Sequence, residues 1–215
     1  MSSARENIMQ RIRQANEFCA EANAQQMIEQ RLHQHARGPR PQWPGNLITH
    51  FIKKAQQSAA SISMVDGEAD LVDAVRAYLV EQSVDNRLLC ASTALIKGLN
   101  WPDDVFIEAR AATTHDKVVL VEAFAGIAET GSVVMCSSQE TPVSLNFLAD
   151  YFICVVHQKN VVNTIDDLWK KIREEKSQMP RAVNIITGPS RTADVEQIIQ
   201  MGAHGPRKVH VLLLD

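Results

Sequence analysis

Short apolar runs alternate with amphipathic stretches along most of the chain. The runs have the β-branched and aliphatic character of buried strands: "SISMV" (61–65), "RLLCA" (87–91), "VFIEA" (105–109), "KVVLVEAF" (117–124), "SVVMCSS" (132–138), "YFICVVH" (151–157), "AVNIIT" (182–187) and "KVHVLLL" (208–214). Helical periodicity is found between them, over about 47–60, 68–82, 164–176 and 192–201. This alternation predicts an α/β fold in which a mostly parallel sheet carries helices on both faces.

One stretch departs from the alternation. Between Val118 and Ser138 two strand-like runs follow one another with no helical segment between them. Parallel neighbours need a crossover connection, whereas antiparallel neighbours need only a turn. We therefore expect an antiparallel excursion within the otherwise parallel sheet.

The N-terminal part has a different pattern. Residues 4–35 predict one helix with a narrow apolar stripe, formed by Ile8, Ile12, Ala15, Phe18 or Cys19, and Ala22. The segment "ARGPRPQWPGN" (36–46) then holds three prolines and two glycines, which end the helix and form a loop. We expect a helical arm over residues 1–45 and an α/β domain over residues 46–215.

Composition and charge narrow the class of protein. With 215 residues, 45% hydrophobic and 22% charged, the chain suits one large domain with an appendage. A net charge of −3 gives no overall attraction to nucleic acid. No apolar run approaches the roughly 20 residues of a transmembrane helix, and the first residues lack the apolar region of a signal peptide, so we expect a cytoplasmic protein.

The basic character of the arm leaves two interpretations open. Residues 1–60 hold eight Lys/Arg and four Glu, a balance of +4. A basic arm can contact nucleic acid, but the arm has no interleaved aromatic residues and no recognition motif. A solvated helical face that docks on its own domain or on a neighbouring subunit is the favoured interpretation.

The cysteines argue against metal chemistry on this chain. Cys19, Cys90, Cys136 and Cys154 are far apart, and no pair has C-x-x-C spacing. Neither a zinc site nor an iron–sulfur cluster built by the chain alone is expected. Three of the four stand in apolar runs and are interpreted as small buried hydrophobic residues in a reducing compartment. A nucleophilic cysteine is the less favoured alternative.

A strand, a turn and a predicted helix meet near Gly188. At this corner the residues Gly188, Pro189, Ser190, Arg191 and Thr192 are candidates for ligand binding. A helix N-terminus attracts anions, and Arg191 can hold a carboxylate or phosphate through two hydrogen bonds. The structural alternative is that Ser190 or Thr192 caps the helix and Pro189 opens it.

Two further residues near this corner carry the same ambiguity. Asp194 lies in the first turn of the predicted helix, where it either faces a ligand or itself interacts favourably with the helix dipole. His204 stands between Gly202 and Gly205, at the predicted C-terminus of the same helix. A favourable dipole interaction is preferred for His204 over metal ligation, because no second ligand stands at metal-site spacing.

The segment "AFAGIAETGSVVM" (123–135) contains a single acid, Glu129, followed by Thr130 and Gly131. At an exposed turn Glu129 is simply solvated. In a crevice it loses water, its pKa rises, and it becomes a candidate acid, base or nucleophile. Glu129 is therefore the candidate catalytic residue, and Thr130 and Gly131 are candidates for ligand binding.

Long motifs resemble one known family. "IAETGSVV" (127–134) is followed about sixty residues later by "ITGPSRTADVEQIIQMGAHGPRKVHVLLLD" (186–215), and "SSARENIMQRIR" (2–13) and "RGPRPQW" (37–43) precede them. Together they resemble the lactate utilization protein C family, the LUD-domain proteins. The resemblance implies a fold like the NagB, RpiA and CoA-transferase group. It also implies a role in oxidising L-lactate to pyruvate with two partner proteins that carry the iron–sulfur clusters.

Two function classes follow. The favoured one is a binding or assembly subunit of the lactate-oxidising system, with no self-contained active site and no cofactor of its own. The alternative is an independent enzyme of the CoA-transferase or sugar-phosphate-isomerase type that uses Glu129. The segment from Ala128 to Gly131 resembles the S-E-N-G motif of CoA transferases, with Ser and Asn replaced. Under either class, a small anionic ligand and self-association stay open.

One arrangement would unite the candidates. Both glycine turns adjoin apolar strands, so we expect them to face one crevice at the carboxyl ends of the strands. Arg191 would then hold an anion, and Glu129 would lie near the chemistry or pair with Arg191.

Overall fold

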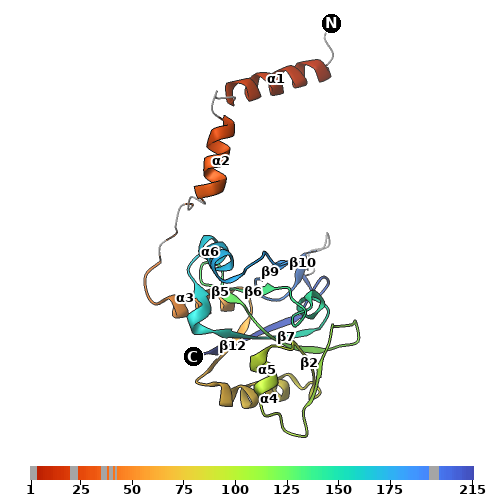
Figure 1. Cartoon of the computed structure of the whole chain (residues 1–215). Helices are drawn as coiled ribbons and strands as arrows, with labels where there is room; N and C mark the ends of the chain where they lie inside the picture. Colours follow the sequence, from red (N-terminus) through yellow and green to blue (C-terminus); the bar gives the residue numbers. More distant parts are fainter. Residues whose placement is uncertain (1–3, 20–23, 35–37, 39–40, 42, 194–198) are drawn as a thin grey trace. The chain divides into compact units, whose positions relative to one another are not determined.

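The computed structural model describes residues 4–19, 24–34, 38, 41, 43–193 and 199–215. The chain divides into two compact units, Met1–Arg40 and Pro41–Asp215 (Figure 1). In the first unit, helices α1 (Ala4–Cys19) and α2 (Ala24–Gln34) replace the single predicted helix. Each has an exposed apolar pair at i,i+4 spacing, Ile8 with Ile12 and Ile28 with Leu32.

The second unit is built on a six-stranded sheet of order β1-β12-β7-β4-β2-β3 in which every pair is parallel. The strands are β1 (Ser61–Val65), β2 (Arg87–Cys90), β3 (Phe106–Ala109), β4 (Val118–Glu122), β7 (Tyr151–His157) and β12 (Lys208–Leu214). Strands β7 and β12 pair along their whole length, and covered central strands of this kind need apolar residues on both faces. The predicted mostly parallel α/β fold is confirmed.

A second sheet of four strands has the order β8-β5-β6-β9. Its strands are β5 (Ala125–Ile127), β6 (Ser132–Cys136), β8 (Val161–Val162) and β9 (Val183–Ile186). The antiparallel excursion is confirmed in the pairing of β5 with β6, but its predicted place in the main sheet is wrong. The backbone N–H of Ala123 still donates to Val155 of β7, whereas that of Phe124 donates to Val134 of β6. The chain therefore leaves the main sheet between these two residues.

Helices and the second sheet cover the two faces of the main sheet (Figure 1). Helices α4 (Leu71–Gln82) and α5 (Ala94–Gly98) lie on one face, and α3 (Leu47–Gln57) lies with the second sheet on the other. Helix α6 (Ile165–Glu175) covers the outer face of the second sheet, where Leu168 and Ile172 pack against Ala125, Ile127 and Val134. The described residues of this unit also form three short 3-10 helices: η1 (Glu68–Asp70), η2 (Val143–Asn146) and η3 (Gln158–Asn160).

Local signals fix the helix ends. Asn46 opens α3 by accepting a hydrogen bond from the N–H of Ile48 at 2.7 Å, and Thr164 opens α6 by accepting from Asp167 at 3.2 Å. Helix α3 ends before the predicted residue 60, because Ala59 has a left-handed φ of 64° that cannot continue a helix.

The predicted helix over 192–201 is wrong in the residues that the structure describes. Strands β10 (Arg191–Ala193) and β11 (Ile199–Met201) form an antiparallel hairpin there. Ser190 is held on both sides, since its N–H donates to Pro206 at 2.8 Å and its carbonyl accepts from Gly202 at 2.9 Å. These bonds between distant residues prevail over the local helical period, which is a weaker preference. Asp194, and with it the rest of 194–198, lies outside the described residues.

Candidate functional site

The two glycine turns singled out in the sequence pack against the C-terminal end of α3. Gly131 has a φ of 70°, and a Cβ atom there would lie 2.1 Å from the backbone nitrogen of Ala55. Gly188 has a φ of 69°, and its Cβ would lie 1.9 Å from the carbonyl oxygen of Ser58. Both positions need a left-handed backbone and a close approach, so only glycine fits either of them.

A chain of hydroxyl groups joins these two turns. Thr130 Oγ1 lies 2.6 Å from Ser132 Oγ, and Ser132 Oγ lies 2.6 Å from Thr187 Oγ1. Ser132 is fully buried at the start of β6, and Thr187 directly precedes Gly188. The structure thus brings Thr130 and Gly131 together with Gly188, at the carboxyl ends of β5 and β9 in the second sheet.

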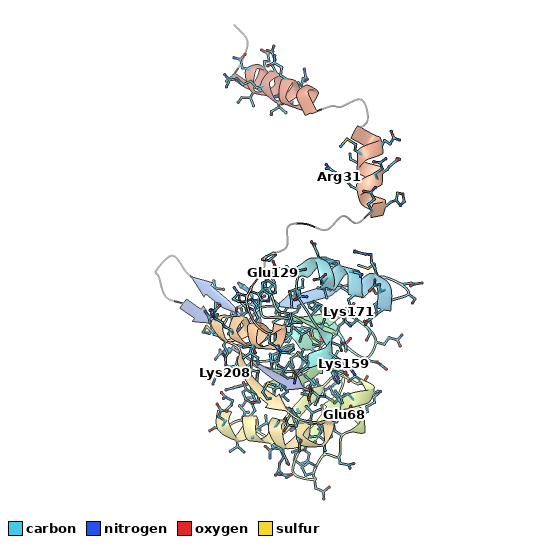
Figure 2. The ribbon with its side chains drawn as sticks, turned by 90° about the vertical axis from the view of Figure 1, so that its left-hand side faces the viewer. Arg31, Glu68, Glu129, Lys159, Lys171 and Lys208 are labelled. Atoms are coloured by element: carbon cyan, nitrogen blue, oxygen red, sulfur yellow. The ribbon has the colours of Figure 1, made fainter. Side chains whose placement is uncertain are left out.

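Glu129 lies in the turn between β5 and β6, beside the start of α6 (Figure 2). Its Oε2 accepts a hydrogen bond from the N–H of Ile165 at 3.2 Å, and its own N–H donates to the carbonyl of Asn163 at 2.9 Å. A carboxylate at this place satisfies a free helix N–H and interacts favourably with the helix dipole. The side chain is half-buried, and its catalytic role stays a prediction.

The remaining candidates lie around the β10–β11 hairpin. Arg191 is exposed, and within the described residues no ion pair joins it to Glu129. Pro189 is buried, Thr192 is half-buried in β10, and the N–H of His204 donates to Ser190 Oγ at 3.3 Å. A strand begins at Arg191, so the predicted helix N-terminus is not formed in the described residues. No helix dipole attracts an anion at this place, and neither Ser190 nor Thr192 is a helix cap. For the same reason His204 does not end a helix.

The topology of the main sheet points to another place. From β2 the chain continues through α5 to β3, its neighbour on one side, whereas from β4 it continues through the second sheet to β7, its neighbour on the other side. The carboxyl ends of β2 and β4 are therefore a topological switch point. Ligands of open α/β sheets bind in the crevice at such points.

A cavity of about 390 Å³ opens at this switch point. Its walls come from the loop between β2 and α5, the end of β4 and the residues after it, the end of β6 and the loop that follows it, η3, and the end of α6 with its following loop: Thr93, Glu122, Ala123, Phe124, Cys136, Ser137, Ser138, Glu140, Thr141, Asn160, Glu175, Lys176, Gln178 and Pro180. The volume falls within the range of small-molecule sites, roughly 300–1,000 Å³. None of the residues predicted from the sequence lines it.

A carboxylate in the wall of this cavity contacts an imidazole that lies outside the wall. Glu122 ends β4 and lines the cavity, and its Oε1 lies 3.2 Å from Nε2 of His157, which ends β7. The side chains of Glu122 and His157 are 24% and 14% exposed. With Oε1 directed at the imidazole, the second carboxylate oxygen is the one left to accept a hydrogen bond from a ligand.

Other polar groups of the wall differ in how fully they are engaged. Asn160 and Glu175 are engaged by Lys171, which does not itself line the cavity: its Nζ donates to Asn160 Oδ1 at 3.1 Å and to Glu175 Oε1 at 2.6 Å. Lys176, by contrast, has its ammonium nitrogen 5.0 Å from the centre of the Phe124 ring and forms no ion pair with a described residue. The hydroxyl oxygen of Thr93 is buried and lacks a hydrogen-bond partner in the described part of the chain.

The cysteine of this cavity is not an activated nucleophile. Burial raises the pKa of the Cys136 thiol, although the charge of Lys176 works in the opposite direction. Burial likewise raises the pKa of Cys90 and of Cys154. Thiolates are the reactive form of cysteine, and a raised pKa favours the protonated thiol in all three side chains.

A second cavity, of about 330 Å³, lies under the segment that joins β3 to β4. Arg110 lines this cavity, and its guanidinium is already hydrogen-bonded to two carboxylates. Two of its nitrogens donate to Asp116, at 2.7 and 2.8 Å, and its Nε donates to Glu108 at 2.9 Å. The guanidinium holds the pKa of Asp116 well below its usual range. Because these charges already pair with one another, we place the candidate site at the switch point.

Part of this site could be found in the sequence. Glu122 directly follows the apolar residues 118–121, and His157 ends the run "YFICVVH" (151–157). The carboxyl ends of parallel strands meet at one edge of a sheet. The other wall residues carry no such signal, because they come from loops whose positions depend on the second sheet.

Metal and membrane features were also searched in the described residues. They contain no cluster of three or more His, Cys, Asp or Glu side chains arranged to hold a metal ion. Over the same residues, every helix is too short or too polar to span a bilayer.

Comparison with known proteins identifies the family. The model of the LUD domain matches residues 48–214, so the chain belongs to the LUD domain family, as its motifs predict. The uncharacterized protein YkgG of Escherichia coli is 29% identical over 165 residues, which cover 75% of this chain and 70% of YkgG. Lactate utilization protein C of Bacillus subtilis is 33% identical over 92 residues, which cover 41% of this chain but only 38% of that protein.

A solved structure agrees with the fold. The crystal structure of a DUF162 family protein from Deinococcus radiodurans has a TM-score of 0.57 and 19% identity to this chain. It covers 81% of this chain and all of its own length. At this level of identity the likeness concerns the fold alone.

Proposed function

We propose that this chain is a subunit of an L-lactate-oxidising system, in which it acts with iron–sulfur proteins in the cytoplasm. Its role there is to bind a ligand or to assemble the partners, and the partners carry the clusters. The observation that supports this proposal is membership of the LUD domain family together with the similarity to lactate utilization protein C of several bacteria.

The chain's own chemistry is compatible with a division of labour. The thiols of Cys90, Cys136 and Cys154 lie in separate strands and have raised pKa values, which disfavours thiolate ligation. Electron transfer is therefore assigned to the partners, and this chain contributes the cavity between β2 and β4.

The experiment is affinity purification of the tagged chain from its own host grown on L-lactate. We expect the eluate to contain iron–sulfur proteins and to oxidise L-lactate to pyruvate with an artificial electron acceptor. The matched control is the same purification from cells grown without lactate. Deletion of the gene should also abolish growth on L-lactate, and normal growth of the deletion strain would refute the proposal.

The alternative of an independent enzyme that uses Glu129 gains no specific support. The carboxylate of Glu129 is bonded to the N-terminus of α6, and the candidate anion site at Arg191 lacks the predicted helix terminus. We therefore favour the subunit role.

A further inference from the structure

We propose that the cavity at the β2–β4 switch point binds a small 2-hydroxy carboxylate, with its carboxylate at Lys176 and its hydroxyl at Glu122. The identity of the acid as a hydroxy acid rests in part on the proposed function. The assignment of the two ends of the ligand rests on the cavity itself.

The first step is to identify which wall groups are available. Glu175 and Asn160 are engaged by Lys171, and the Thr141 hydroxyl donates to the carbonyl of Cys136 at 2.8 Å. Among the described wall residues, the charged groups left open are the Lys176 ammonium, the second oxygen of Glu122 and the exposed Glu140 carboxylate. They offer one cationic donor and two anionic acceptors, and of the two acceptors only Glu122 is held in place by a second side chain, that of His157.

The second step is to ask which ligand satisfies both Lys176 and Glu122. An ammonium donates only and prefers a carboxylate, whereas an ionised carboxylate accepts only and needs a hydroxyl or N–H group. A ligand that carries an anionic group and a hydroxyl on neighbouring carbons meets both needs.

The third step excludes more highly charged ligands. Glu175 is paired with Lys171, so the wall keeps two unpaired carboxylates, of Glu122 and Glu140, against the one ammonium of Lys176. A dianion such as a phosphate monoester would be repelled by this excess of negative charge. A singly charged acid is favoured instead.

The size of the cavity adds a specificity. A volume of about 390 Å³ is larger than a three-carbon acid needs. The cavity therefore selects for the carboxylate and the adjacent hydroxyl of the ligand and not for the length of its carbon chain. We expect 2-hydroxybutyrate to bind about as tightly as L-lactate, and propionate, which lacks the hydroxyl, to bind about tenfold more weakly.

The test is calorimetric titration of the purified full-length chain with L-lactate, propionate and glycerol 3-phosphate. Lys176→Met should weaken lactate binding by about tenfold or more, because a charge-assisted hydrogen bond is lost. Glu122→Gln should reduce the preference for lactate over propionate. Lys170→Met and Glu174→Gln are the matched controls, since these two residues of α6 form an ion pair at 3.6 Å and do not line the cavity.

Circular dichroism of each variant verifies that it is folded. The inference is overturned if lactate does not bind saturably, if both cavity variants bind it like the wild type, or if propionate or the phosphate binds as well as lactate. These results are separable from the proposed function. A chain that binds lactate but is dispensable for growth on it refutes only the subunit role, and a required subunit that binds no lactate refutes only this inference.

Discussion

Ser132 Oγ lies 2.6 Å from Thr187 Oγ1, so a fully buried residue of β6 contacts the residue that leads into Gly188. This contact joins two motifs that are more than fifty residues apart in the sequence. It shows that the motifs share one structural task, which is to hold the second sheet against the end of α3.

Removing either hydroxyl should therefore uncouple the turns. We expect Ser132→Ala to lower the free energy of unfolding by about 1–2 kcal/mol, because it breaks two hydrogen bonds of a buried residue. Thr187→Val should cost less, since Thr187 is exposed. In urea unfolding of both single variants and the double variant, the effects should not add; additive effects would show that the contact does not couple the turns.

The two glycines should tolerate no side chain. Gly131→Ala and Gly188→Ala should each lower the free energy of unfolding by more than about 2 kcal/mol, because a Cβ would overlap the backbone of α3 or of Ser58. Gly98→Ala is the matched control, with open space around its Cβ position. Thermal unfolding near the wild-type temperature for Gly188→Ala would contradict the close approach.

His210 should make the domain sensitive to mild acid. This ring is 3% exposed, stacks on Tyr78 and receives or donates a hydrogen bond at Ser61, and burial lowers its pKa from 6.5 to about 4. Between pH 6.5 and 4 this histidine is therefore protonated in the unfolded chain but neutral in the folded chain. The neutral His210 therefore contributes about 3 kcal/mol to the free energy of unfolding. This contribution is complete above pH 6.5 and is lost as the pH falls toward 4.

Urea unfolding at a series of pH values measures this loss. His210→Phe should flatten the slope between pH 6.5 and 4, although His50, whose pKa is also lowered by burial, keeps a part of it. Asp116 affects stability in a separate pH range. Its ionised carboxylate stabilises the fold above pH 3.8, the ordinary pKa of this group, and the stabilisation is lost only in stronger acid. An unchanged slope in His210→Phe would show that the histidine is not the group that titrates.

Glu129 should behave as a helix cap. Glu129→Gln keeps the shape and removes the charge beside α6, so we expect a loss of stability of about 0.3–1 kcal/mol that shrinks with added salt. Lactate oxidation by the reconstituted system should persist. A folded Glu129→Gln variant without activity would instead support the catalytic role predicted from the sequence.

The N-terminal unit should be dispensable for folding. Deleting residues 1–40 removes one compact unit and leaves the core of Pro41–Asp215 complete. We expect an unchanged thermal unfolding temperature and weaker recovery of partners in affinity purification, because the exposed pairs Ile8–Ile12 and Ile28–Leu32 are lost. Unfolding of the truncated chain would show that the arm belongs to the core.

The sequence by itself determined the elements whose signals are local. The strands β1, β7 and β12 follow from continuous apolar runs, the start of α6 follows from Thr164, and the family follows from long motifs at 127–134 and 186–215. These signals are contained in a few neighbouring residues, so no knowledge of distant contacts was needed to find them.

Only the tertiary structure decided where the chain changes sheet and which loop residues lie with Glu122 in the cavity. The helical period at 192–201 gave way to pairing of Arg191 with Met201, and the cavity unites Thr93, Glu122 and Lys176 from three distant segments. Strand pairing and crevice formation depend on contacts between residues far apart in the chain. Local periodicity carries no information about such contacts, so the switch point between β2 and β4 is visible only once the strand order is known.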